Sequence, residues 1–323
     1  MNRRHFTLAT LGMSIANSAL AQAAAPWSPT KPVRIIVGPP GGILDVVARQ
    51  LAEPLQSALG QPVVVENKPG AGNIVAMQAA KSSAPDGHTL IITTFVEMTI
   101  NPWLYDRLPY DPLKDFEPVT VLYAGPILLV AHPSFPGQTL ADLIRLAKAQ
   151  PGKYLYGSPG VARPPHIWAE RFKHTAGIDI GHVPFKSGAP LAHAVLAGDV
   201  MLGMEGAPPL LPHVMAGKLK ALAVTGDKRL TALPDVPTFA EAGVPGIGLT
   251  WVGIVAPAGT PPAAVERLQQ EIGRALQSPQ IKAAYEQAGR TAVGNTPQEF
   301  AALIRKELPE WRDIVKATGL RPE

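Results

Sequence analysis

Residues 33–66 read VRIIVGPPGGILDVVARQLAEPLQSALGQPVVVE and contain one complete strand–helix–strand unit. The apolar run at 33–37 is typical of a buried strand. After a glycine-rich loop, Val47, Leu51 and Leu55 recur every four residues, which places them on one face of a helix. Residues 62–66 predict the next strand. Because a parallel crossover needs about 30 residues, the stretch predicts an α/β fold.

The same alternation continues along the chain. Thr139 is typical of a helix N-cap. Beyond residue 256 we expect two helices, one starting at Pro261 and one at Thr296 with a capping-box pattern. Repeated strand–helix units predict mostly parallel sheets with helices on both faces, and ligands that bind at loops after strands. Further strands are expected at 90–94, 127–131, 200–204, 219–224 and 252–256.

Length and composition indicate a globular protein of about two domains. The chain has 323 residues, of which 46% are hydrophobic and 17% charged. Cysteine is absent, which excludes disulfides, thiolate metal sites and cysteine nucleophiles.

The first 21 residues have the features of an export signal. Arg3 and Arg4 precede a mildly apolar stretch that ends in a small-x-small cleavage pattern at 19–21, with a second possible cut after Ala23. Both the general and the twin-arginine export routes stay open. Removal of this segment lowers the net charge from +4 to +2, and no basic cluster with interleaved aromatics follows, so no nucleic-acid partner is expected. No later run reaches the ~18 apolar residues of a spanning helix.

The loop at 38–45 is the first candidate site. It leaves a strand and enters a helix, and Gly41 and Gly42 allow close backbone approach to an anion held by helix N–H groups. It lacks the Gly-Lys-Ser/Thr ending of a phosphate loop. The alternative is a tight turn in which Asp45 merely stabilises the first helical turn. The loop at 70–75 is interpreted as structural, because Val75 stands where a dinucleotide fingerprint needs Gly or Ala.

The loop at 156–166 is the second candidate site. It offers backbone N–H groups, the Ser158 hydroxyl and the Arg163 guanidinium, a good fork for a carboxylate. The alternative is an exposed arginine on a rigid proline-rich loop. Glu205, at the end of an apolar run, either faces the cleft or caps a helix.

Histidine spacing predicts no metal site, since no His-x-x-x-His or His-x-His pair occurs among the eight histidines. Asp45, Ser158 and His166 can be assembled into a hydrolytic triad on paper, but nothing in their spacing requires one.

Seven motifs together resemble the substrate-binding proteins of tripartite tricarboxylate transporters, the Bug family, over essentially the whole mature chain. They are PGGxxDVVAR at 40–49, PVVVENKPGAGN at 62–73, APDGHTL at 84–90, LPYDPxKDF at 108–116, VPFK at 183–186, LPDVPTFAEAG at 233–243 and APAGTP at 256–261.

The resemblance implies a periplasmic binding protein of type II, with two α/β lobes joined by crossing hinge strands. Lobe 1 is expected at 26–125 plus 252–323, and lobe 2 at 126–251. The family's ligand is a small carboxylate held between the two glycine-rich loops. The closed form then docks to membrane transporter subunits. A monomer without cofactor, catalytic residues or metal is expected. A sensing subunit for a membrane kinase and, more distantly, a periplasmic serine hydrolase are the alternatives.

Three departures from the family pattern bear on the ligand. Leu44 precedes Asp45 where the family has a hydroxyl residue, Ala162 and Arg163 end the second loop, and Met201 replaces an aspartate. The pocket is therefore expected to be poorer in hydroxyls and to gain a cation, with Arg163 pairing a second carboxylate. The expected ligand-binding residues are Pro40, Gly41, Gly42, Ile43, Asp45, Thr94, Phe95, Ser158, Gly160, Val161, Arg163, His166 and Glu205.

Overall fold

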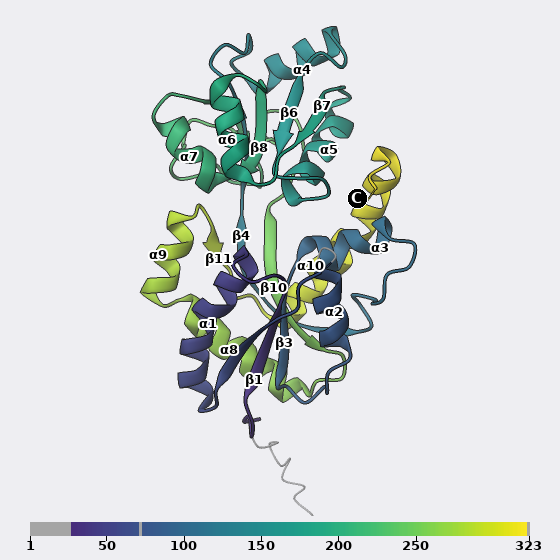
Figure 1. Ribbon diagram of the computed structural model, residues 1–323, viewed down its shortest axis with the longest axis vertical. Coiled ribbons are helices and arrows are strands. Elements are labelled where there is room, and N and C mark those ends of the chain that lie inside the picture. Colours follow the sequence, from purple (N-terminus) through teal and green to yellow (C-terminus); the bar gives the residue numbers. More distant parts are fainter. Residues whose placement is uncertain (1–26, 71–72, 322–323) are drawn as a thin grey trace, which may run out of the picture.

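The computed structural model describes residues 27–70 and 73–321. Two α/β lobes follow one another along the long axis of the molecule, and the strands β4 (Phe116–Gly125) and β10 (Thr250–Pro257) run between them (Figure 1). The predicted export signal at 1–21 lies outside the described residues.

The sheet of lobe 1 has six strands in the order β11-β4-β10-β3-β1-β2. Strand β1 pairs in parallel with β2 and with β3, which confirms the strand–helix–strand unit at 33–66. The strands of this sheet are β1 Val33–Val37, β2 Val63–Asn67, β3 Thr89–Thr94, β4 Phe116–Gly125, β10 Thr250–Pro257 and β11 Thr291–Ala292.

The helices of lobe 1 follow the predicted periodicity. In α1 the repeating apolar residues are buried, and Gly60 ends the helix in the left-handed conformation (φ 68°), which a glycine adopts without strain. At Thr296 both hydrogen bonds of the capping box are formed. The helical segments of this lobe are α1 Ile43–Leu59, α2 Ile74–Lys81, the π-helical η2 Val96–Ile100, α3 Asn101–Leu104, α8 Pro262–Leu276, α9 Pro279–Gln287 and α10 Pro297–Thr318.

The expectation of two C-terminal helices was wrong, because α9 is a third. Ser278 caps it by accepting a hydrogen bond from the Ile281 N–H, and Pro279 occupies its first position. The pair Ser278-Pro279 therefore separates α8 from α9. The chain then forms β11 at the edge of the sheet before α10 starts.

The sheet of lobe 2 has five strands in the order β7-β6-β8-β5-β9. Thr139 is the N-cap of α4, as predicted. The strands are β5 Ile127–Ala131, β6 Leu155–Ser158, β7 Gly181–Pro184, β8 Leu202–Gly206 and β9 Lys220–Val224, and the helices are α4 Leu140–Ala149, α5 Pro164–Ala176, α6 Gly188–Ala197 and α7 Ala207–Met215.

Both sheets are mixed, with four parallel pairs among nine. Among the named strands of the described residues, parallel pairing is confined to β2-β1-β3 and β7-β6-β8. In lobe 1 the chain returns from lobe 2 as β10, antiparallel to β3 and β4. In lobe 2 it arrives as β5, antiparallel to β8 and β9. Sequence periodicity does not indicate the direction in which a strand enters its sheet, so the mixed pairing was not predicted. The two-lobed α/β class is confirmed.

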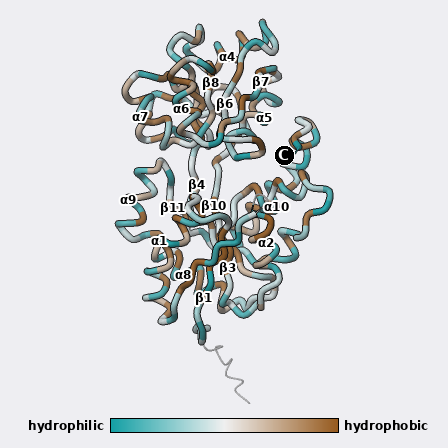
Figure 2. Tube along the Cα trace, viewed as in Figure 1, coloured by the Kyte–Doolittle hydropathy of each residue, from teal (hydrophilic) through white to brown (hydrophobic). Residues whose placement is uncertain are grey.

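Apolar residues gather on the strands (Figure 2), and one buried cluster joins the lobes. Trp168 of α5 lies 4.9 Å, centroid to centroid, from Trp311 of α10 and 6.0 Å from Phe95. Arg171 stacks over both tryptophan rings. This aromatic cluster fixes α5 of lobe 2 against α10 of lobe 1 on one side of the molecule.

Candidate functional site

A cavity of about 470 Å³ lies between the lobes, beside the crossing strands. Gly125, Pro126 and Thr250 form the hinge side. At one end the loop 288–290 of lobe 1 lies directly against the start of α7, since a Cβ added to Gly289 would be 2.8 Å from that of Ala207. The remaining lining residues are Ile43, Tyr123, Ile127, Pro159, Arg163, Pro164, Pro165, Lys186, Ser187, Gly188, Glu205, Gly206, Pro208, Ala288 and Arg290.

Four helices begin at this cavity. Ile43 is the first residue of α1, Pro164 of α5, Gly188 of α6 and Ala207 of α7. A helix N-terminus carries a partial positive charge, which favours an anion. The first turns of α1 and α6 also present N–H groups, whereas α5 begins with two prolines and α7 has prolines at its second and third positions, and proline has no N–H. One of these helices belongs to lobe 1 and three to lobe 2.

Three cationic side chains line the same cavity. Arg163 is the N-cap residue of α5, Lys186 precedes α6, and Arg290 lies between α9 and β11. Within residues 27–70 and 73–321, the Arg163 guanidinium and the Lys186 ammonium have no hydrogen-bond or ion-pair partner. The Arg290 guanidinium stands 4.8 Å from the ring centre of Tyr123. Together with the helix ends, these cations make the cavity electropositive.

Glu205 is the single acidic residue among the lining residues that the structure describes. Its Oε1 accepts the Gly206 N–H at 2.6 Å. Its Oε2 faces the start of α6, where a Cβ on Gly188 would be only 2.6 Å away. Desolvation in the cavity raises the pKa of the Glu205 carboxyl to about 7.

The first glycine-rich loop is held from within by Asp45. The Gly41 N–H donates to Asp45 Oδ2 (3.0 Å), and Asn67 and Arg49 donate to the same carboxylate. The sequence predicts that Gly41 and Gly42 donate main-chain N–H groups to the ligand, and in this structure the Gly41 N–H donates to Asp45. Pro40, Gly41 and Gly42 do not line the cavity; from this loop only Ile43 does.

The second glycine-rich loop is built over a buried polar cluster. The Ser158 side chain is fully buried, and its Oγ lies 2.7 Å from His182 Nε2 and 3.1 Å from the Gly160 carbonyl oxygen. His166 Nδ1 accepts the Ala162 N–H, and its ring stacks on His182 with centroids 4.0 Å apart. Burial lowers the pKa of both imidazoles to about 4, so both are neutral near pH 7.

Several predicted residues therefore shape the loops rather than line the cavity. Ser158 and His166 support the second loop, and Gly160 and Val161 are not among the lining residues. Thr94 donates its N–H to the buried Glu97 carboxylate (2.7 Å), while Phe95 is buried in the aromatic cluster. Of the thirteen predicted residues, the structure brings three to the cavity: Ile43, Arg163 and Glu205.

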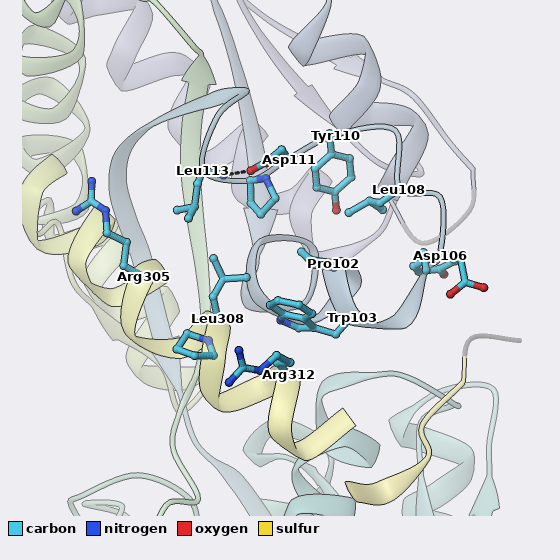
Figure 3. A pocket seen from close by; sticks show the side chains of 13 residues that line it. Pro102, Trp103, Asp106, Leu108, Tyr110, Asp111, Leu113, Arg305, Leu308 and Arg312 are labelled. Atoms are coloured by element: carbon cyan, nitrogen blue, oxygen red, sulfur yellow. Dashed lines mark hydrogen bonds between the residues drawn. The ribbon is translucent and has the colours of Figure 1, made fainter. Parts of the chain in front are cut away.

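A second hollow of about 560 Å³ lies on lobe 1, between residues 102–113 and α10 (Figure 3). Its lining is mostly aromatic and aliphatic, and the side chains of Asp106 and Asp111 offset those of Arg305 and Arg312. All of its lining residues belong to lobe 1, so lobe closure does not enclose it. The inter-lobe cavity is therefore the candidate site.

Comparison with known proteins agrees with this fold. Residues 47–320 match the family described as "Tripartite tricarboxylate transporter family receptor". The chain belongs to this receptor family. The Bug resemblance is thereby confirmed. Protein BugT of Bordetella pertussis is 36% identical over 318 residues, which cover 97% of this chain and 98% of BugT.

Solved receptor structures have the same fold. Rpa4515 of R. palustris, solved with adipate, is 33% identical with a TM-score of 0.75, covering 91% of this chain and 99% of that one. MatC of Rhodopseudomonas palustris, solved with bound malate, is 30% identical with a TM-score of 0.73, covering 89% and 99%.

Members of this receptor family bind solutes and are not enzymes. The hydrolase alternative also fails on geometry, because the Ser158 hydroxyl contacts His182 rather than His166 and is buried. Among the residues described for this receptor, no helix combines the length and the apolar character needed to cross a membrane.

Two cations of the receptor's cavity, Lys186 and Arg290, were not predicted. Lys186 follows the carboxyl end of β7, so the rule that ligands bind beyond strand ends would have found it. Arg290 comes from lobe 1, about 125 residues farther along the chain than the second loop, and no local pattern marks it.

Replacing Asp45 by asparagine should destabilise the receptor by about 2–3 kcal/mol near pH 7, because it removes the charge from a buried, triply hydrogen-bonded carboxylate. Hydrogen bonds from Arg49, Asn67 and the Gly41 amide lower the pKa of Asp45 to about 2. A folded-state pKa below the unfolded value gives stability that is complete above about pH 4 and is lost as the pH falls toward 2. Urea unfolding at pH 7 and pH 3 measures both effects.

The control is Asp106→Asn, which removes an exposed acid of the same lobe. It should leave the free energy of unfolding within about 0.5 kcal/mol of the parent. If Asp45→Asn behaved like this control at pH 7, the carboxylate would not be what holds the first loop.

Proposed function

We propose that this receptor captures a small carboxylate, with one to three carboxyl groups, in the inter-lobe cavity. One observation carries the proposal: four helix N-termini and three cationic side chains, contributed by both lobes, meet at one cavity. Structural relatives that hold adipate and malate support the same ligand class.

Arg163, Lys186 and Arg290 would pair with the ligand's carboxylates. The starts of α1 and α6 would add N–H groups, and those of α5 and α7, which begin with prolines, would add mainly positive potential. Because each lobe contributes cations, closure about the hinge at β4 and β10 would bury the ligand's charge between them. We assign lobe 1 to residues 26–125 plus 252–323 and lobe 2 to 126–251, a division supported by the two separate sheets.

We further propose that residues 1–21 direct export to the periplasm and that the ligand-bound receptor delivers its ligand to the membrane subunits of a tripartite transporter. Membership of the receptor family supports both steps. Co-purification of the membrane subunits with the receptor, in the presence and absence of ligand, tests delivery.

A thermal-shift screen of refolded, ligand-free receptor tests the ligand class. Mono-, di- and tricarboxylates and amino acids are compared with their neutral amides at equal concentration. At least one carboxylate should stabilise the fold by about 2–3 kcal/mol at a hundred times its Kd, and its amide should not. Stabilisation by none of the acids would refute the proposal.

A further inference from the structure

Glu205 is an acidic group in a cavity that otherwise favours anions. It lies at the end of β8, beside the starts of α6 and α7, and shares the cavity with Arg163, Lys186 and Arg290. A carboxylate here opposes the binding of another carboxylate, so its presence needs a physical reason.

Structural roles do not account for it. Within the described ranges the Glu205 side chain forms no ion pair with any cation, and its one hydrogen bond is with the N–H of the next residue, Gly206. A carboxylate can accept about four hydrogen bonds, so most of its acceptor capacity is unused. A half-buried carboxylate with one donor costs stability that a neutral side chain would not cost.

We propose that Glu205 selects carboxylates that also carry a hydrogen-bond donor, a hydroxyl or an ammonium group, and binds that donor. This inference rests on the proposed function and names the class of ligand within it. The ligand's carboxylates pair with the cations and helix ends, while its donor supplies the missing partner of Glu205.

An unsubstituted acid cannot make this contact. Because the pKa of Glu205 is about 7, the group is ionised above about pH 8. In that range, closure over an unsubstituted acid would desolvate the carboxylate further and leave it opposite only acceptors and CH₂ groups, which costs binding free energy. A hydroxy or amino acid of the same chain length avoids that cost. The preference for substituted acids therefore has two sources: the hydrogen bond that they form with Glu205, and the cost of leaving Glu205 without a partner when an unsubstituted acid binds.

Calorimetry with matched acids above about pH 8, where Glu205 is ionised, tests the proposal. The probes are succinate, malate and aspartate, and glutarate, 2-hydroxyglutarate and glutamate, which differ within each series only at one carbon. In at least one series the parent should bind a substituted acid about tenfold or more tighter than the unsubstituted one, as expected for a hydrogen bond to a charged group. In Glu205→Gln this ratio should fall below about threefold, while the unsubstituted acid binds at least as tightly as before.

Two variants complete the design. Asp199→Asn removes an exposed acid from the same lobe and should keep the parent ratio. Glu205→Asp retains the charge and should still bind the substituted acid more tightly than the unsubstituted one. This variant keeps the proposal testable if Glu205→Gln does not fold. Equal binding of substituted and unsubstituted acids by the parent, or an unchanged ratio in Glu205→Gln, overturns the inference while the proposed function stands. Binding of none of these six dicarboxylates by the parent also overturns the inference, and the proposed function falls with it only if the thermal-shift screen finds no other carboxylate that binds.

Discussion

Replacing Arg163 by alanine should weaken dicarboxylate binding about 30-fold or more. The guanidinium lies at the N-cap of α5, lines the cavity and has no partner among the described residues, so it is available to a ligand. A charge-assisted hydrogen bond that closure buries contributes about 2 kcal/mol, which corresponds to this factor. Calorimetry with the dicarboxylate that gives the largest thermal shift measures it.

Arg145→Ala is the matched control, because Arg145 is an exposed arginine on α4 of the same lobe whose ion pair is with Asp142. It should leave the affinity unchanged. Arg163→Lys keeps the charge but loses the planar fork, and an intermediate affinity is expected. Unaltered binding by Arg163→Ala would remove this residue from the site.

Local patterns predicted most of the secondary structure. In α1 the four-residue spacing of Val47, Leu51 and Leu55 is enough to predict the buried face, because it places all three apolar side chains on one side of the helix. The capping box at Thr296 is equally local. Both features depend on residues that lie only three or four positions apart, so they can be recognised in the sequence itself.

Contacts between distant segments could not be predicted in the same way. Ser158 and His166 were predicted as site residues. The pairing of β6 with β7 instead places His182 near Ser158, and the Ser158 hydroxyl is buried. Arg290 reaches the cavity only because β11 pairs with β4. Strand pairing decides both outcomes, and periodicity does not specify which strands pair.

The inter-lobe aromatic cluster leads to the largest stability effect that we expect. Trp311 is 1% exposed, with its ring centre 5.8 Å from that of Phe95 and 4.9 Å from that of Trp168. Trp311→Ala removes this buried ring and leaves a cavity where the lobes meet, so the free energy of unfolding should fall by about 3–5 kcal/mol. Urea unfolding followed by circular dichroism measures the loss.

Trp103→Ala is the comparison, because it makes the same tryptophan-to-alanine change at a less buried position. Trp103 belongs to the same lobe but is 38% exposed, and the Arg312 guanidinium lies 6.0 Å from its ring centre. Because a partly solvated ring loses fewer contacts and leaves no enclosed void, its removal should cost about 1 kcal/mol or less. Equal losses in the two variants would show that the packing of the Trp311 ring between α5 and α10 adds nothing to stability.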